Sequence, residues 1–105
     1  ELAESGPAVV RPGDVLNLVC KVTGVSISVS NEWHWMKESP EKGLEWVSAI
    51  NVHSGNKWYA SSVKKRATIS ADETRNKFYL QINSVISADS YLYFCTRLCT
   101  LRKSY

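Results

Sequence analysis

Short segments in which hydrophobic and polar residues alternate run along most of the chain. In "VLNLVCKV" (15–22), hydrophobic side chains fall on one face, while Asn17 and Lys21 fall on the other. A period of two is typical of a half-buried β-strand. The same alternation appears in "ATISA" (67–71) and "KFYLQIN" (77–83), and no segment carries a sustained helical stripe. The pattern therefore predicts strands rather than helices.

Turn-forming sequences separate these segments about every 8 to 12 residues. They are "SGP", "RPGD", "VTG", "SPEKG", "HSGN", "ADETRN" and "SADS". Short strands at this spacing indicate an antiparallel sandwich or barrel rather than a βαβ unit. The last strand-like run, "YLYFCT" (91–96), is hydrophobic on both faces. One of its faces meets the core, and we expect the other to contact a partner.

Composition narrows the possible classes of protein. At 105 residues, the chain is expected to form one domain, 1–105, with one modest core. The net charge of +3 comes from 13 basic and 10 acidic residues that are interspersed, which does not indicate a dedicated polyanion binder. No hydrophobic run approaches the roughly 18 residues of a membrane span, so membrane insertion is not expected. Three cysteines, Cys20, Cys95 and Cys99, leave one pair and one extra thiol.

A collinear set of motifs resembles an immunoglobulin heavy-chain variable domain. "ESGPAVVRPG" resembles the opening strands of that family, and "LNLVCKVTG" resembles the strand that carries its first cysteine. "WMKESPEKGLEWV" looks like the stretch from its buried tryptophan through the Gly-Leu-Glu-Trp motif, "RATISADETRNKFYLQINSV" like its third framework, and "ADSYLYFC" like its Asp-x-x-x-Tyr-x-Cys signature. The likeness runs to about Arg97, with one extra residue near position 30. It implies an all-β, V-type antiparallel β-sandwich with Greek-key connections.

The resemblance implies a disulfide between Cys20 and Cys95 that joins the two sheets, with Trp35 packed against it. A disulfide of this kind requires an oxidising compartment. We therefore expect a secreted or extracellular protein, or the ectodomain of a B-cell surface receptor.

The resemblance also implies roles for residues near one end of the sandwich. Tyr93 stands where the family has its tyrosine corner, and Arg66 and Asp89 stand where it has an ion pair. Treated as an exposed pair, they are expected to contribute under about 1 kcal/mol. Ala67 is smaller and Tyr91 larger than the residues usual at these positions. We expect the Tyr91 ring to fill space that Ala67 leaves open.

The resemblance places ligand contacts in three loops at one end of the sandwich: "VSISVSNEWH", "NVHSGNKW" and the segment after Arg97. Ser, Asn and Gly supply adaptable polar contacts around stiff aromatic anchors. The residues expected to contact an antigen are Ser30, Asn31, Glu32, Trp33, His34, Asn51, His53, Ser54, Asn56, Lys57, Trp58, Arg97, Leu98 and Thr100. For Trp33, framework packing beside Trp35 stays open, because inward and outward assignments slip easily near a strand end.

A second expected contact surface is the sheet face that, by resemblance, meets a light-chain variable domain. Its residues are Met36, Glu38, Leu44, Trp46 and Phe94. Large hydrophobic groups on one face are better explained by a partner than by exposure to water. Gly43, Leu44 and Trp46 match the light-chain-pairing form rather than the autonomous form, in which polar or charged residues replace them. Glu38 departs from the family's Gln, so either the partner supplies a donor or the pairing is weakened.

The end of the sequence also departs from the family, in which a Trp-Gly-x-Gly strand follows the third loop. Only eight residues follow Arg97, and they lack this motif. We expect the final strand, strand G, to be missing or incomplete, as a truncated segment or as a strand donated by another chain. Cys99 is then either a buried free thiol or part of an intermolecular disulfide.

The sequence predicts a binding domain: an antigen-binding heavy-chain variable domain or, alternatively, a V-set adhesion or receptor domain. The chain has no Gly-x-Ser-x-Gly, His-Glu-x-x-His or phosphate-binding glycine loop, so we do not expect an enzyme. His34, His53 and Cys99 lack metal-ligand spacing, so neither a metal nor a cofactor is expected. Nucleic-acid binding through Lys57, Trp58 and nearby arginines is disfavoured by the modest net charge.

Overall fold

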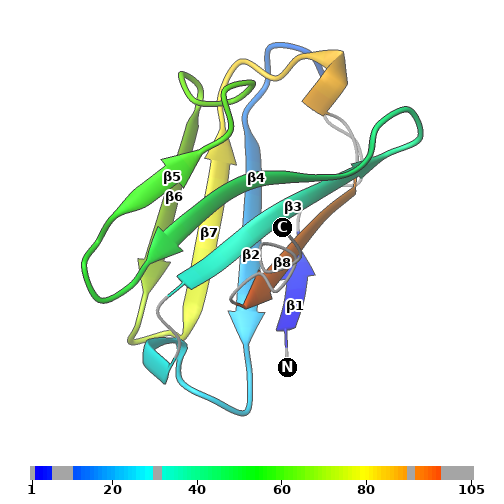
Figure 1. Ribbon diagram of the computed structural model, residues 1–105. Helices are drawn as coiled ribbons and strands as arrows, with labels where there is room; N and C mark the ends of the chain where they lie inside the picture. Colours follow the sequence, from blue (N-terminus) through cyan, green and yellow to red (C-terminus); the bar gives the residue numbers. More distant parts are fainter. Residues whose placement is uncertain (1, 6–10, 30–31, 90–91, 98–105) are drawn as a thin grey trace.

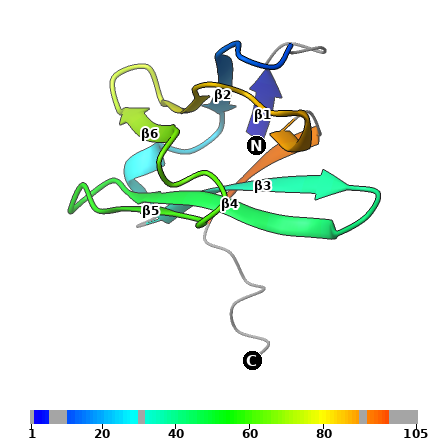
Figure 2. The same ribbon diagram turned by 90° about the horizontal axis from the view of Figure 1, so that it is seen from above.

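The computed structural model describes residues 2–5, 11–29, 32–89 and 92–97. In this part of the chain, eight strands form two antiparallel sheets of four strands each. The sheets lie face to face as two layers (Figures 1 and 2). The first sheet has the order β1 (Leu2–Ser5), β2 (Leu16–Val22), β7 (Lys77–Ile82), β6 (Ala67–Asp72). The second has the order β5 (Lys57–Tyr59), β4 (Gly43–Asn51), β3 (Glu32–Ser39), β8 (Leu92–Arg97).

The connections alternate between the layers. The chain crosses from one sheet to the other between β2 and β3, between β5 and β6, and between β7 and β8, so that β8 lies beside β3. Two short 3-10 helices, η1 (Ile27–Val29) and η2 (Ser87–Asp89), lie on two of these crossings. The prediction of an all-β V-type sandwich with Greek-key connections is confirmed. Within the described residues β8 pairs with β3 alone, and the predicted loss of strand G concerns residues 98–105, outside them.

The core consists of the inward faces of both sheets. In β2, Leu16, Leu18, Cys20 and Val22 are buried, as their alternation predicts. The ring of Phe78 on β7 contacts two rings of the second sheet. Its centroid lies 5.5 Å from that of Trp33 and 5.4 Å from that of Trp35. Aromatic contacts of this kind add to the free energy of burial.

A disulfide between Cys20 and Cys95 joins the sheets, with the Cα atoms 6.2 Å apart, which confirms the predicted pairing. Cys20 lies opposite Phe78, and Cys95 lies opposite Trp35, so the Trp35–Phe78 contact crosses the core beside the bridge. Trp35 Nε1 is buried without a hydrogen-bond partner among the described residues. Packing, and not hydrogen bonding, therefore holds this indole in place.

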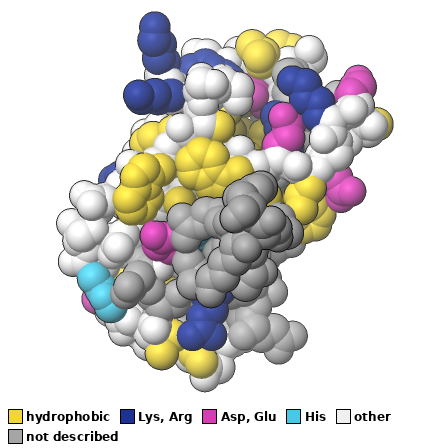
Figure 3. Space-filling model, viewed as in Figure 1, with side chains coloured by type: hydrophobic (Ala, Val, Ile, Leu, Met, Phe, Trp, Pro, Cys, Tyr) yellow, Lys and Arg dark blue, Asp and Glu magenta, His cyan; other side chains and the backbone are white. Residues whose placement is uncertain are grey.

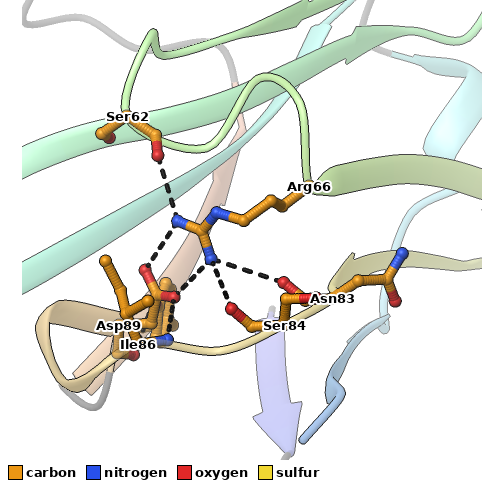
Figure 4. A network of polar contacts seen from close by, with 7 residues as sticks. Ser62, Arg66, Asn83, Ser84, Ile86 and Asp89 are labelled. Atoms are coloured by element: carbon orange, nitrogen blue, oxygen red, sulfur yellow. Dashed lines mark hydrogen bonds and ion pairs between the residues drawn. The ribbon is translucent and has the colours of Figure 1, made fainter. Parts of the chain in front are cut away.

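At one end of the sandwich, Arg66 and Asp89 form a network rather than an isolated ion pair (Figure 4). Arg66 Nη1 donates to Asp89 Oδ2 at 2.7 Å, and Nη2 donates to Asp89 Oδ1 at 3.4 Å. The guanidinium also donates to the backbone carbonyls of Ser62, Asn83 and Ser84. Asp89 is only 2% exposed. The expectation of an exposed pair is therefore wrong, because the Asp89 carboxylate is buried, where it accepts hydrogen bonds from Arg66 and from the backbone N–H of Ile86.

The tyrosine corner is present next to this network. The hydroxyl of buried Tyr93 donates to the backbone carbonyl of Asp89 at 2.7 Å. Burial raises the pKa of Tyr93 above its ordinary value of 10.0, and the nearby Asp89 carboxylate raises it further. The predicted packing of the Tyr91 ring into space that Ala67 leaves open stays a prediction, because Tyr91 lies outside the described residues. Ala67 itself is half-buried against the core.

The Tyr93 pKa predicts a loss of stability at alkaline pH. Since the folded-state pKa is raised, the unfolded chain gives up the proton first as pH rises above about 10, and stability then falls. Tyr93→Phe should cost about 1 kcal/mol near neutral pH through the lost hydrogen bond, and this difference should shrink toward zero by about pH 11. Urea unfolding of both proteins in a Cys99→Ser background measures it. A difference that stays constant across this range would show that the hydroxyl does not resist ionisation.

Candidate functional site

The three loops predicted to bind a ligand arise at the same end of the second sheet. Glu32, the first residue of β3, pairs with Asn51, the last residue of β4. Trp33 pairs with Arg97, the last residue of β8. The start of β3, the end of β4 and the end of β8 therefore lie side by side at one end of the sheet (Figure 1). We call this region the loop end.

The loop between β4 and β5 is held by its own hydrogen bonds. Asn51 Oδ1 accepts from the backbone N–H groups of His53 at 2.9 Å and Ser54 at 3.1 Å. The Asn51 N–H donates to the Asn56 carbonyl, and the Gly55 N–H donates to the Asn51 carbonyl. Gly55 has a φ of +80°, a conformation that favours glycine. The Asn51 side chain therefore shapes the loop from within.

The loop before β3 is anchored in the core and tied to the β4–β5 loop. Ile27, at the start of η1, is fully buried, and its carbonyl accepts a hydrogen bond from Trp33 Nε1 at 2.7 Å. The next carbonyl, that of Ser28, accepts from His53 Nε2 at 2.7 Å. The two loops thus form one connected platform.

Asn76, in the turn between β6 and β7, supports this platform from behind. It adopts a φ of 58°. Its Oδ1 accepts from the Ile27 N–H at 2.8 Å, and its Nδ2 donates to the carbonyls of Val22 at 2.8 Å and Val25 at 2.7 Å. Sequence reasoning missed this residue. An Asn in a turn does indicate a positive φ, but its partners are about 50 positions away in the chain.

Loss of the Asn76 side chain should loosen the loop before β3. Asn76→Ala removes three hydrogen bonds, leaves the buried Ile27 N–H without its acceptor and strains the positive φ, which together should cost about 2 to 3 kcal/mol. Asn76→Gly keeps the backbone conformation and should cost less. Hydrogen exchange of the Ile27 to Val29 amides, alongside urea unfolding, measures both effects. Unchanged protection of these amides in both variants would mean that Asn76 does not hold the loop.

The predicted ligand contacts divide by exposure. Exposed side chains belong to His53, Ser54, Asn56, Lys57, Trp58 and Arg97. Glu32 and Asn51 are half-buried. Ser30, Asn31, Leu98 and Thr100 lie outside the described residues.

Two predicted contacts, Trp33 and His34, are corrected by the structure. Trp33 is 0% exposed and His34 is 1% exposed, so neither offers a surface to a ligand. Trp33 shares the inward face of β3 with Trp35, where both rings contact Phe78. His34 points to the opposite face and is buried there.

His34 connects the loop end to the outer face of the second sheet. The indole Nε1–H of Trp46 can only donate, so His34 Nδ1 must accept this 3.1 Å hydrogen bond. The neutral ring then carries its proton on Nε2, which donates to Glu32 Oε1 at 3.1 Å. This tautomer fixes the direction of the chain of hydrogen bonds from Trp46 through His34 to Glu32.

The outer face of the second sheet brings together the residues predicted to meet a partner domain. Residues directly opposite each other in neighbouring strands share a face. Met36 pairs with Trp46 on one side and with Phe94 on the other. Glu38 likewise pairs with Leu44 and with Leu92, which sequence reasoning assigned to this face only through the hydrophobic pattern of 91–96. We call these six residues the outer-face cluster.

A β-bulge decides which β4 side chains join the outer-face cluster. The register between β3 and β4 shifts after Trp35, where Trp35 pairs with Ser48 but Met36 pairs with Trp46. The extra residue, Val47, is buried, and Trp46 lies on the outer face. Without this bulge, the two side chains would exchange faces.

The outer-face cluster is accessible at its edges. Leu44 is 52% exposed and Leu92 is 68% exposed, while Trp46 and Phe94 are half-buried and Met36 is buried. Figure 3 shows hydrophobic side chains gathered on this side of the molecule. Large exposed hydrophobic groups that lie together are typical of interaction surfaces.

Comparison with known protein families identifies the class of protein. Residues 4–103 match the immunoglobulin V-set domain family. The chain therefore belongs to the V-set immunoglobulin family. Domains of this family are generally non-enzymatic, mediate protein–protein interactions, and are typically extracellular or secreted.

The described residues lack two further features. They contain no group of three or more His, Cys, Asp or Glu side chains arranged to hold a metal ion. They also contain no helix with the length and hydrophobicity needed to cross a membrane.

Proposed function

We propose that this chain is the heavy-chain variable domain of an antibody. In this proposal, the outer-face cluster binds a light-chain variable domain, and the loop end binds an antigen. The observation that carries the proposal is the outer-face cluster itself, in which exposed Leu44 and Leu92 flank Trp46, Met36 and Phe94. A domain that works alone gains nothing from exposing such a face to water.

The loop end supports the antigen-binding part of the proposal. Exposed Trp58 offers a stiff aromatic anchor, and exposed Ser54, Asn56 and Lys57 surround it with polar groups. The internal hydrogen bonds of the platform hold the loops in place before binding. They therefore reduce the entropic cost of ordering the loops when a ligand binds. Binding is by surface complementarity, without bond-making chemistry. Glu32, Asn51, His53, Arg97 and the four predicted contacts outside the described residues complete the proposed site.

The remaining parts of the proposal concern compartment and covalent state. We place the protein outside the cell, because the core disulfide needs oxidising conditions to form and persist. Cys99 is proposed to be a buried free thiol or to form an intermolecular disulfide. Nucleic acid and a cofactor have no role in the proposed function.

Complex formation with a recombinant light-chain variable domain tests the proposal. We expect a one-to-one complex in native mass spectrometry and size-exclusion chromatography. Leu44→Glu should abolish the complex. The matched control Val15→Glu, which changes a residue of similar exposure directly before β2 of the other sheet, should leave it intact. A chain that ignores the light chain and instead pairs with itself through Leu44 would indicate the alternative, a V-set adhesion or receptor domain.

A further inference from the structure

Glu38 is the only carboxylate placed among the hydrophobic side chains of the outer-face cluster. Its cross-strand neighbours are the exposed residues Leu44 and Leu92, and Met36 lies on the same face two residues earlier. Among the described residues, no ion pair involves Glu38. The side chain of the adjacent Lys37 points to the opposite face of the sheet, and its Nζ lies 3.9 Å from Glu45 Oε1.

Among the described residues, the outward positions of β3 and their strand partners carry acid without base. The outward positions of β3 are Glu32, His34, Met36 and Glu38, and the described residues that pair with them on β4 and β8 include no Lys or Arg. His34 is buried with both ring nitrogens hydrogen-bonded. Any domain that covers this face must therefore meet a carboxylate at Glu38 without help from a cation of the same face.

Covering Glu38 removes water from its carboxylate. A carboxylate that loses water without gaining a hydrogen-bonded cation is strongly destabilised, whereas a facing Lys or Arg compensates for the loss. In a symmetric pair of copies, both carboxylates would be covered, and the described partners of β3 on neither face would supply the cation. The charge at Glu38 therefore acts against self-pairing and favours a partner of opposite charge.

We propose that Glu38 sets the choice of partner: the outer-face cluster takes a variable-type domain that presents a Lys or Arg side chain to Glu38. This inference rests on the proposed function, because it specifies the partner for the same face. It assigns Glu38 a role in specificity, while the hydrophobic residues around it supply most of the buried area.

The test uses three versions of one recombinant light-chain variable domain that differ only at the residue facing Glu38, which is Lys, Gln or Glu. We expect the parent chain to bind the Lys version about tenfold more tightly than the Gln version and the Glu version about tenfold more weakly. Glu38→Lys should reverse this order, and Glu38→Gln should nearly abolish it. The preference should weaken only slightly between about 0.05 M and 0.5 M salt, because salt screens a covered charge pair much less than an exposed one.

A charge change elsewhere provides the control. Glu73→Lys alters the net charge equally but lies in the β6–β7 turn, and it should leave the order of the three affinities unchanged. Equal affinity of the parent chain for all three versions would overturn the role of Glu38 and leave the proposed light-chain pairing standing. Failure to bind any version, by the parent or by Glu38→Gln, would instead reject the proposed function.

Discussion

Replacing Cys20 by Ala and Cys95 by Val should lower the free energy of unfolding by about 4 to 5 kcal/mol. The bridge closes a loop with a sequence separation of 75 residues, and in the chain-entropy treatment this restricts the unfolded chain strongly. Small domains have about 5 to 15 kcal/mol of stability in total. The variant should therefore be close to unfolding near body temperature.

Urea unfolding under non-reducing conditions measures the effect of the bridge. Both parent and variant carry Cys99→Ser, so that the extra thiol cannot form a wrong pair. The parent in the presence of a reductant should approach the stability of the double variant. A double variant within about 1 kcal/mol of the parent would show that packing around Trp35 and Phe78 holds the sheets together without the bridge.

Arg66→Ala should destabilise the fold by about 3 to 5 kcal/mol. The substitution leaves the buried Asp89 carboxylate with the backbone N–H of Ile86, 3.0 Å away, and without its cation. Asp89→Ala should cost less, because the guanidinium of Arg66 keeps its contacts with backbone carbonyls. The pKa of Arg66 is raised, chiefly by its hydrogen bond to Asp89, so the side chain stays charged in the folded domain.

The chain offers a matched comparison for this ion pair. Arg75 Nε lies 3.8 Å from Asp72 Oδ2, but the two side chains are 72% and 38% exposed. Arg75→Ala should cost less than about 1 kcal/mol, as is usual for a surface pair. Replacing Arg66 and Asp89 together by Met and Leu should recover part of the loss, since no buried charge remains. Equal costs for Arg66→Ala and Arg75→Ala would refute the claim that burial makes the difference.

Much of the sandwich could be predicted because its strands follow a simple period. In β2 and β7, alternate residues such as Leu18 and Leu80 are buried, and they pair with each other across the strands. The disulfide and the identity of Trp35 as a core residue followed from resemblance to a family whose motifs have fixed places in the sandwich. Period and motif together were enough to define the fold.

The site was less predictable, because it depends on small shifts and distant contacts. The bulge at Val47 places Trp46 on the outer face, and this was predicted only through the family resemblance, because no local pattern marks the bulge. Trp33 shares its inward face with Trp35, yet it lies only one residue from the start of β3, where a slip in register would expose it. The support that Asn76 gives to Ile27 joins segments that only the folded chain brings together.

The burial of the Arg66–Asp89 pair was missed for a related reason. Sequence gives the charges and their family position, but it does not show that the Asp89 carboxylate is buried and bonded to the Ile86 N–H while the guanidinium reaches three backbone carbonyls. The value of an ion pair depends on this solvation and not on the identity of its two residues.

A crystal structure of the chain with a light-chain variable domain tests most directly whether the outer face of the second sheet is a pairing surface. The account predicts that Leu44, Trp46, Leu92 and Phe94 become buried against the partner, with the loop between β4 and β5 left open to a ligand. A partner seated on the sheet of β1, β2, β7 and β6, or across the loop end, would contradict it.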